Sequence, residues 1–308
     1  MSVGDSWSEF PTVGLAFVVL ATLWGGSFVA IEAGVDEVPP LLFAALRYDL
    51  AGVFVLAWGA LRGVWLPRTR DDLLAVGLVG ALLIAGYHAL LYVGQTTVPG
   101  AVAAAVVALV PVLTALFAAV LLDDERLAPA GYGGVALGFL GVVVVSAPGS
   151  VGAAPPVGVA LILGATVLWA LGTVLVRRLS PRLTPGALQG WGMLLGAGAL
   201  HAGSLLGGER QALPTSPTAV GALAFLVLGS GVVAFLLYFY LLGTVGATEA
   251  SLVDYAEPVT AAALAWGLFG YVPSAGAVLG FLLVAAGFLL VKHEALLAVV
   301  SRARTTGA

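Results

Sequence analysis

Residues 99–121 read PGAVAAAVVALVPVLTALFAAVL, an apolar stretch with no charged side chain and with Pro111 near its middle. A helix needs about 20 apolar residues to cross the hydrocarbon of a bilayer, so this stretch predicts a transmembrane helix. Stretches of the same kind recur along the whole chain. We expect ten helices, near residues 12–32, 41–61, 73–93, 99–121, 130–147, 157–177, 185–206, 219–242, 248–269 and 275–292.

The composition of the chain supports a membrane protein. Of its 308 residues, 61% are apolar and only 9% are charged. A soluble domain carries roughly 25% charged residues, because its surface must face water. A surface that faces lipid removes that requirement. We therefore expect an all-α integral membrane protein whose main surroundings are the lipid bilayer.

Several classes of function find no support in the sequence. The net charge is −4 and there is no basic run, which argues against nucleic-acid binding. There is no Cys, and the three histidines are far apart, so we expect no metal site. H-E-x-x-H, G-x-S-x-G and P-loop motifs are all missing from the sequence. We therefore expect neither a cofactor nor an enzyme.

The basic residues predict the orientation. If the N-terminus is cytoplasmic, ten of the 12 Lys and Arg residues fall in cytoplasmic loops or the C-terminal tail. Only Arg210 falls outside, and Arg47 lies within a helix. Cytoplasmic loops normally carry this excess of positive charge. We expect a protein of the cell membrane with residues 1–11 and 293–308 in the cytoplasm.

The chain also repeats itself. Matching features recur at a spacing of 145 to 147 residues, in the same order: Leu23-Trp24 with Leu168-Trp169, Pro40 with Pro185, Pro111 with Pro258, and Gly134 with Gly280. Residues 12–147 and 157–292 are therefore predicted to be two units of five helices. An odd number of helices makes the second unit enter the membrane from the opposite side, as in many secondary transporters.

These motifs resemble the drug/metabolite transporter superfamily, specifically its EamA-type members. The resemblance lies in Leu23–Ala30 (LWGGSFVA), Leu46-Arg47-Tyr48, Val110-Pro111 through Leu127, and Asp254–Pro258 (DYAEP). One departure is Gly270–Pro273, where the family usually has a Glu. This departure puts an essential role for the first-repeat Glu125 in doubt.

The resemblance implies a secondary-active transporter. We expect an exporter of small metabolites, such as amino acids or related compounds, that works by alternating access at a central cavity between the repeats. The alternative is a channel or a membrane scaffold, and a membrane enzyme ranks after these. The substrate itself does not follow from the resemblance.

Charged residues within the predicted helices mark candidates for the cavity. Asp254 and Glu257 share one helix face, where two ionised carboxylates would repel each other unless one is protonated, hydrated or paired. Glu257 is the deeper, and a proton or a cationic substrate group could neutralise it. Asp254 could instead reach water at the helix end. Arg47 could bridge to Glu257 or extend to the outer headgroups.

Other candidates come from aromatic and polar side chains near mid-membrane. Trp24 and Trp169 form a matched pair that could line the cavity or pack against helices and lipid, and Ser27 lies one turn beyond Trp24. His88 and Tyr92 are one turn apart, and His88 could relay a proton or be an ordinary core residue. Tyr240 could face the cavity or lipid. Candidate residues of the cavity and of proton coupling are thus Trp24, Ser27, Arg47, His88, Tyr92, Trp169, Tyr240, Asp254 and Glu257.

Two further patterns concern movement and assembly. Pro111 and Pro258 weaken the backbone at matched places and are candidate hinges, although each could be a static kink. Gly134-x-x-x-Gly138 and Gly276-x-x-x-Gly280 allow helices to approach closely. These glycines could pack helices within the chain or pair two protomers in a homodimer.

Overall fold

The computed structural model describes residues 5–123, 125–145, 155–245, 252–272, 274–291 and 293, with side chains from residue 12 onward. Within these ranges the chain consists of helices joined by short turns, and it has no strand. The helices in chain order are α1 (Asp5–Val35), α2 (Pro40–Leu61), α3 (Arg70–Leu78), η1 (Val79–Gly86), α4 (Tyr87–Gln95), α5 (Gly100–Val107), α6 (Val110–Leu121), α7 (Pro129–Val145), α8 (Pro156–Leu179), α9 (Pro185–Leu206), α10 (Pro217–Ala224), η2 (Phe225–Val233), α11 (Ala234–Thr244), α13 (Val253–Phe269) and α14 (Ala275–Val291).

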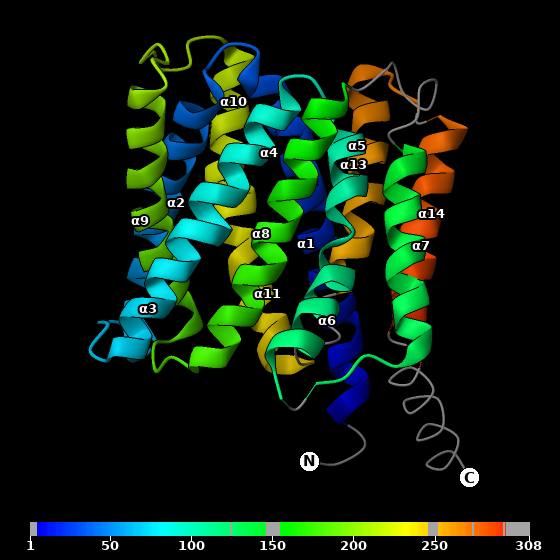
Figure 1. Cartoon of the computed structure of the whole chain (residues 1–308). Helices are drawn as coiled ribbons and strands as arrows, with labels where there is room; N and C mark the ends of the chain where they lie inside the picture. The colour runs from blue at the N-terminus through cyan, green and yellow to red at the C-terminus, as the bar shows by residue number, and fades with distance from the viewer. Residues whose placement is uncertain are drawn as a thin grey trace.

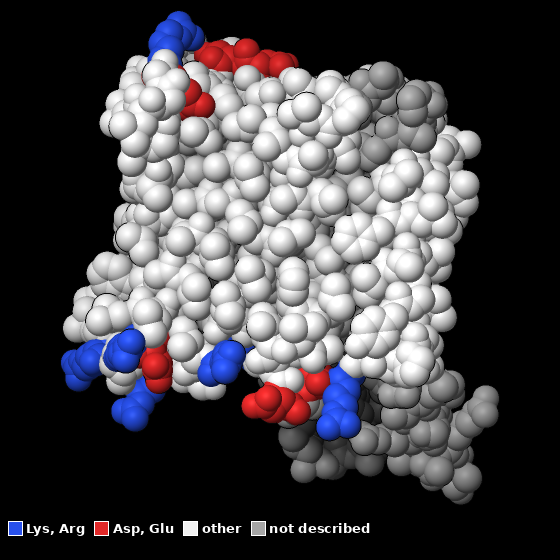
Figure 2. Space-filling model, in the orientation of Figure 1, with Lys and Arg blue, Asp and Glu red and all other residues white. Residues whose placement is uncertain are grey.

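The helices form one bundle with the surface of a membrane protein. Their axes run roughly side by side between an upper and a lower edge (Figure 1). Charged side chains gather at these two edges, and a band without charge lies between them (Figure 2). Six helical runs in the described part of the chain are long and apolar enough to cross a membrane. The chain is therefore a multi-pass helical membrane protein.

Each of the ten predicted stretches overlaps a described helix. The stretch near 73–93 is one continuous run through α3, η1 and α4, and the stretch near 219–242 is one run through α10, η2 and α11. Residues 146–147, 248–251 and 292 of the predicted stretches lie outside the described residues. That all ten runs cross the bilayer remains a prediction.

Several helices begin at residues that suit a helix N-terminus. Pro40, Pro156, Pro185 and Pro217 each open a helix, where the N–H that proline lacks would have no partner. The side chain of Thr69 accepts a bond from the backbone N–H of Asp72, whose carboxylate accepts from that of Thr69 in return. These signals fix where each helix enters the bundle.

The two matched prolines act differently. Pro258 lies inside α13, as predicted. Pro111 does not lie in mid-helix, because the helix is broken there. α5 ends at Val107, α6 begins at Val110, and Pro111 occupies the first turn of α6. The prediction of one continuous helix over 99–121 was wrong at this point.

The two π-helical segments occupy matched positions. η1 and η2 begin 146 residues apart. η1 ends at Gly86 and η2 contains Gly231, and these two glycines are 145 residues apart. A Cβ added at Gly86 would lie 3.0 Å from Ala81 O, and one at Gly231 would lie 2.7 Å from Leu226 O. Both oxygens belong to the residue five positions earlier. The missing side chain therefore lets each wide turn close in the same way.

Glycines also allow two pairs of helices to pack closely. α7 lies against α14, where a Cβ on Gly141 would come within 2.6 Å of Gly280 O (Figure 1). Likewise α2 packs along α9, with Gly190 against the backbone of Leu56. Of the two readings of the glycine motifs, the structure shows packing within the chain for Gly134, Gly138 and Gly280.

Candidate functional site

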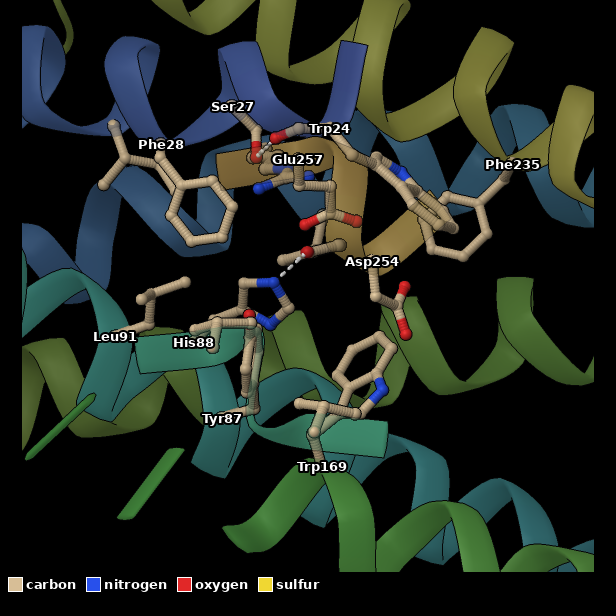
Figure 3. Close-up of a pocket in the computed structure, with 15 residues that line it drawn as sticks. Trp24, Ser27, Phe28, Tyr87, His88, Leu91, Trp169, Phe235, Asp254 and Glu257 are labelled. Carbon is tan, nitrogen blue, oxygen red and sulfur yellow. Dashed lines mark hydrogen bonds between the residues drawn. The ribbon is translucent and has the colours of Figure 1, made fainter. Parts of the chain in front are cut away.

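A cavity lies in the middle of the bundle. Side chains from α1, α2, α4, α8, α11 and α13 line it, together with the ends of α5 and α6 that meet at the break (Figure 3). The lining residues are Trp24, Ser27, Phe28, Ile31, Arg47, Tyr48, Tyr87, His88, Leu91, Val107, Val110, Trp169, Phe235, Asp254 and Glu257. Its wall is therefore mostly aromatic and aliphatic, with one guanidinium and two carboxylates.

Arg47 is held within the protein. Its side chain is 4% exposed, its Nη1 donates to Tyr92 Oη at 3.2 Å, and its Nη2 donates to Ser230 Oγ at 3.0 Å. The guanidinium also lies over the ring of Tyr48, with Cζ 4.9 Å from the centroid. No ion pair joins it to Glu257 in the described structure. Neither sequence hypothesis for Arg47 describes this arrangement, because it neither bridges directly to Glu257 nor extends to headgroups.

His88 has a hydrogen-bond partner at each ring nitrogen. Its Nδ1 lies 3.0 Å from Ile84 O, and a carbonyl only accepts, so Nδ1 carries the proton. Its Nε2 shares a short hydrogen bond with the Tyr48 hydroxyl, which donates to the neutral imidazole and would accept from the charged one. Both nitrogens are therefore occupied by protein groups.

The two tryptophans stand on opposite sides of the cavity. Trp24 Nε1 donates to Ser230 O at 3.3 Å, and its ring lies 5.6 Å from that of Phe235. Across the cavity, the ring of Trp169 lies 4.8 Å from that of Tyr87 (Figure 3). Four rings thus border the space into which the carboxylates point.

Asp254 and Glu257 point into this space from α13 (Figure 3). Glu257 is 9% exposed, and neither carboxylate accepts a hydrogen bond within the described part of the chain. The helix that carries them is held against α1, because Thr260 Oγ1 donates to Ala21 O at 2.7 Å and Gly25 leaves no side chain between the backbones. Two acidic groups therefore lie in a mostly apolar cavity, without a hydrogen-bond partner among the residues that the structure describes.

Each of the two matched prolines leaves one carbonyl without its helical hydrogen bond. An α-helical N–H bonds to the carbonyl four residues earlier, and proline has no N–H. Pro258 therefore gives no bond to Asp254 O, and Pro111 gives none to Val107 O. Val107 and Asp254 both line the cavity, and they occupy matched positions in the two halves of the chain.

The structure brings most of the predicted site residues together. Seven of them line the cavity: Trp24, Ser27, Arg47, His88, Trp169, Asp254 and Glu257. Tyr92 lies behind Arg47 as its hydrogen-bond partner. Tyr240 does not line the cavity, and its side chain is 40% exposed on the outside of the bundle. Of the two alternatives for Tyr240, its position fits lipid contact.

Sequence reasoning missed Tyr48 and Tyr87. Each directly adjoins a predicted residue, Arg47 or His88, and this adjacency was the available signal. The described residues contain no group of three or more His, Asp or Glu side chains placed to hold a metal ion.

Comparison with known proteins identifies the family. The profile of the EamA-like transporter family matches this chain twice, over residues 12–147 and 156–292. The chain is 33% identical over 257 residues to an Escherichia coli K12 protein named uncharacterized inner membrane transporter YedA, covering 83% of this chain and 82% of the relative. It is 28% identical over 282 residues to a probable terminal-alkyne amino-acid exporter of Streptantibioticus cattleyicolor, covering 91% and 93%.

A solved crystal structure shares the fold. It superimposes with a TM-score of 0.65 at 25% identity, covering 91% of this chain and 96% of that one. The fold and the sequence profile agree. The chain therefore belongs to the EamA-like transporter family.

Proposed function

We propose that the protein is a secondary-active exporter of small metabolites, such as amino acids or related compounds, in the cell membrane. It works by alternating access at the central cavity between two inverted repeats, residues 12–147 and 157–292. The observation that carries the proposal is the pair of carboxylates in this cavity, which have no hydrogen-bond partner among the described residues. Such groups are costly in a membrane interior and typically mark a path for substrate or ions.

The pattern of helix contacts supports the inverted repeat. Under the proposed two-fold relation, α2 corresponds to α9 and α7 to α14, and each helix packs against its own counterpart. The contact of α1 with α13 corresponds to the contact of α8 with α5 and α6, and both exist. α1 begins at the lower edge and α8 at the upper edge, as opposite insertion requires (Figure 1). The matched π-segments agree with the same relation.

Hydrogen bonds tie helices together at one end of the cavity. Gln95 Nε2 donates to Phe28 O at 2.8 Å, and Gly100 N donates to the Glu32 carboxylate at 2.7 Å. These bonds join α1 to the end of α4 and the start of α5 above the cavity. A closed end of this kind is part of an end state in an alternating cycle.

The edges of the bundle support the proposed orientation. α2 and α8 both end at the lower edge, where Arg62 and Arg177 are found (Figures 1 and 2). An arginine-rich edge faces the cytoplasm by the positive-inside rule. Both termini then lie in the cytoplasm.

Transport in sealed proteoliposomes tests the proposal. Amino acids and related metabolites that stabilise the purified protein against heat are first identified, since a ligand stabilises by mass action. Labelled forms are then offered with and without a proton gradient. We expect accumulation only with the gradient. Equilibration without accumulation would indicate a channel, and a chemical change without movement would indicate an enzyme.

Glu257→Gln tests the role of the deeper carboxylate. This change keeps the shape and removes the charge, so it should abolish gradient-driven accumulation or its pH dependence. Asp254→Asn should have a smaller effect, and Asp71→Asn, at an exposed carboxylate, should have none. Normal transport by folded Glu257→Gln protein across the pH range would refute the role of this residue.

A further inference from the structure

A polar pair lies on the outside of the bundle, away from the central cavity. His201 Nε2 on α9 lies 2.7 Å from Asp49 Oδ2 on α2. The side chains of Asp49 and His201 are 44% and 34% exposed. The exposed residues one helical turn further along are apolar, Val53 after Asp49 and Leu205 after His201. The pair therefore stands in an otherwise apolar surface.

The pair lies well inside the ends of its two helices. Asp49 belongs to an apolar run that is long enough to cross the membrane, Pro40–Leu61. It is nine residues after Pro40, and His201 is five residues before the end of α9 at Leu206. At 1.5 Å per residue, these positions are roughly 13 Å and 8 Å from the helix ends. The surrounding acyl chains offer the pair no hydrogen bond.

The packing of α2 on α9 does not itself require a polar pair. The internal repeat places Leu195 opposite Asp49 in the alignment, 146 residues later, and Leu56 opposite His201, 145 residues earlier. Both counterparts are apolar and lie on the same two helices. The polar pair is thus a feature of one surface of the bundle, and the shared fold of the repeats does not account for it.

The pair leaves one donor and one acceptor without a partner. A net charge beside lipid is costly, so we expect the pair to be neutral overall, either as imidazolium with carboxylate or as imidazole with carboxylic acid. In both forms Nδ1 of His201 carries a proton and Oδ1 of Asp49 accepts. Neither atom has a hydrogen bond within the described part of the chain. Polar atoms of this kind bond across helix contacts in membranes.

The surface beside His201 allows another helix to come close. Gly198 and Ala202 are exposed on α9, and a Cβ added at Gly198 would have nothing within 4 Å. α9 packs mainly against α2, η1 and α3, and it forms one edge of the bundle (Figure 1). Small residues on the open side of a membrane helix let a second helix approach closely.

We propose that the face formed by α2 and α9 around Asp49 and His201 binds a second copy of this chain. Two copies with the same orientation in the membrane are related by a two-fold axis along its normal, so each residue meets the other copy at its own height. Asp49 and His201 share one height, because they bond to each other. Nδ1–H of each copy then donates to Oδ1 of the other, and four side chains close a ring of hydrogen bonds without net charge.

This interface goes beyond the proposed function. It lies on the lipid-facing side of α2 and α9, and none of the residues that form it lines the central cavity. The pairing is self-complementary, since each copy supplies the same donor and the same acceptor. A second copy therefore satisfies both free atoms at once.

Cysteine cross-linking of the full-length, Cys-free chain in liposomes tests which face is used. Ala202→Cys, at the centre of the face, should form covalent dimers on oxidation. Val143→Cys is the matched control, because Val143 is 65% exposed on α7 at the opposite side of the bundle (Figure 1). Equal yields at the two positions, dimers from position 143 alone, or no dimers at all overturn the proposal.

The polar pair is tested by removing both members together. Asp49→Leu combined with His201→Leu leaves no single charge behind in the apolar surface. Photobleaching of single molecules, labelled through Ser180→Cys, gives the dimer fraction over a range of protein-to-lipid ratios. We expect the double variant to need at least about tenfold higher density than the parent for the same dimer fraction, because two hydrogen bonds between the copies are lost. A monomeric parent at every density, or a double variant that pairs as well as the parent, overturns the proposal.

Gly198→Leu keeps the test decisive if the double variant does not fold. The new side chain begins where nothing lies within 4 Å, so it obstructs a second copy and not the chain itself. Gly133→Leu is the matched control, because this position on α7 is equally open. We expect Gly198→Leu to weaken pairing at least about tenfold and Gly133→Leu to leave it unchanged. Equal pairing of the two variants contradicts the interface.

The inference and the proposed function fail in different ways. Dimers through this face without gradient-driven movement in proteoliposomes refute the transport function and leave the interface intact. Gradient-driven movement by a protein that stays monomeric refutes the interface and leaves the transport function intact. A lipid that such monomers retain, and that the double variant loses, would then be the occupant of the face in place of a second copy.

Discussion

A single methyl group added to α7 tests the close packing of this helix on α14. In Gly141→Ala, the new Cβ would lie 2.6 Å from Gly280 O and 2.8 Å from Val284 N. Close carbon–oxygen contacts in proteins lie at about 3.3 Å, so the helices must separate by roughly 0.7 Å. Both contacts are with backbone atoms, which cannot turn aside as a side chain can. Overpacking of this kind typically costs about 1–3 kcal/mol.

Gly133 on the same helix provides the matched control. A Cβ at this position has nothing within 4 Å, so Gly133→Ala adds no clash. Alanine is favoured over glycine in a helix by roughly 0.8–1 kcal/mol, and this gain is common to both variants. We therefore expect Gly133→Ala to unfold at a slightly higher temperature than the parent, and Gly141→Ala to unfold several degrees lower.

Thermal unfolding of the purified variants in one detergent, followed by circular dichroism, measures the difference. Comparing the two variants cancels the shared helix propensity and leaves the packing effect. If the variants unfold at the same temperature, α7 and α14 are not in the contact described here, and the internal use of the glycines is refuted.

Two further predictions concern the edges of the bundle. Hydrogen bonds from Ser216 and Thr215 lower the pKa of Glu37, between α1 and α2, to about 2 from an ordinary value of 4.5. Because the pKa falls on folding, the bonds stabilise the protein above pH 4.5 and this stabilisation is lost as the pH falls through about 2. Glu37→Gln should therefore unfold at a lower temperature than the parent at neutral pH, with a gap that closes between pH 4.5 and 2; a gap that does not depend on pH would contradict this. The orientation can be tested with single cysteines, because the chain has no Cys of its own. Cysteines placed at Ser180, after α8, and at exposed Leu213, before α10, should react with a membrane-impermeant thiol reagent from opposite sides of the membrane, with position 180 protected in intact cells. Labelling of both positions from one side would refute the proposed topology.

Much of the fold could be predicted from the sequence because hydrocarbon thickness is a strict constraint. It demands long apolar runs, and only helices satisfy their backbone bonds alone in lipid. The helix starts at Pro40 and Pro185 could also be predicted, because proline is favoured in the first turn of a helix. The break before Pro111 was not, because Pro111 and Pro258 look alike in sequence. Only the packing around each proline decides between a break and a continuous helix.

The candidate site was predictable where a residue was costly in a membrane. Asp254, Glu257 and Arg47 stand out because a charge in lipid needs a reason. The direction of Tyr240 could not be predicted, because a tyrosine is as acceptable beside lipid as in a cavity. The partners of Arg47 were also hidden. Tyr92 and Ser230 reach it from other helices, and no spacing along the chain indicates their contact.

The two π-segments have a consequence for the site. A π-turn closes its hydrogen bonds one residue later than an α-turn, so it takes up an extra residue. One residue corresponds to a rotation of about 100° in the α-helix that follows. η1 ends directly before Tyr87 and His88, and η2 ends two residues before Phe235.

Each π-segment therefore sets the phase of a helix that lines the cavity. If one residue were deleted from η1, the chain could wind as an ordinary α-helix. Tyr87 and His88 would nevertheless turn by about a quarter of a circle and leave the cavity. The length of this segment, more than the identity of its residues, is what aims the side chains of the site.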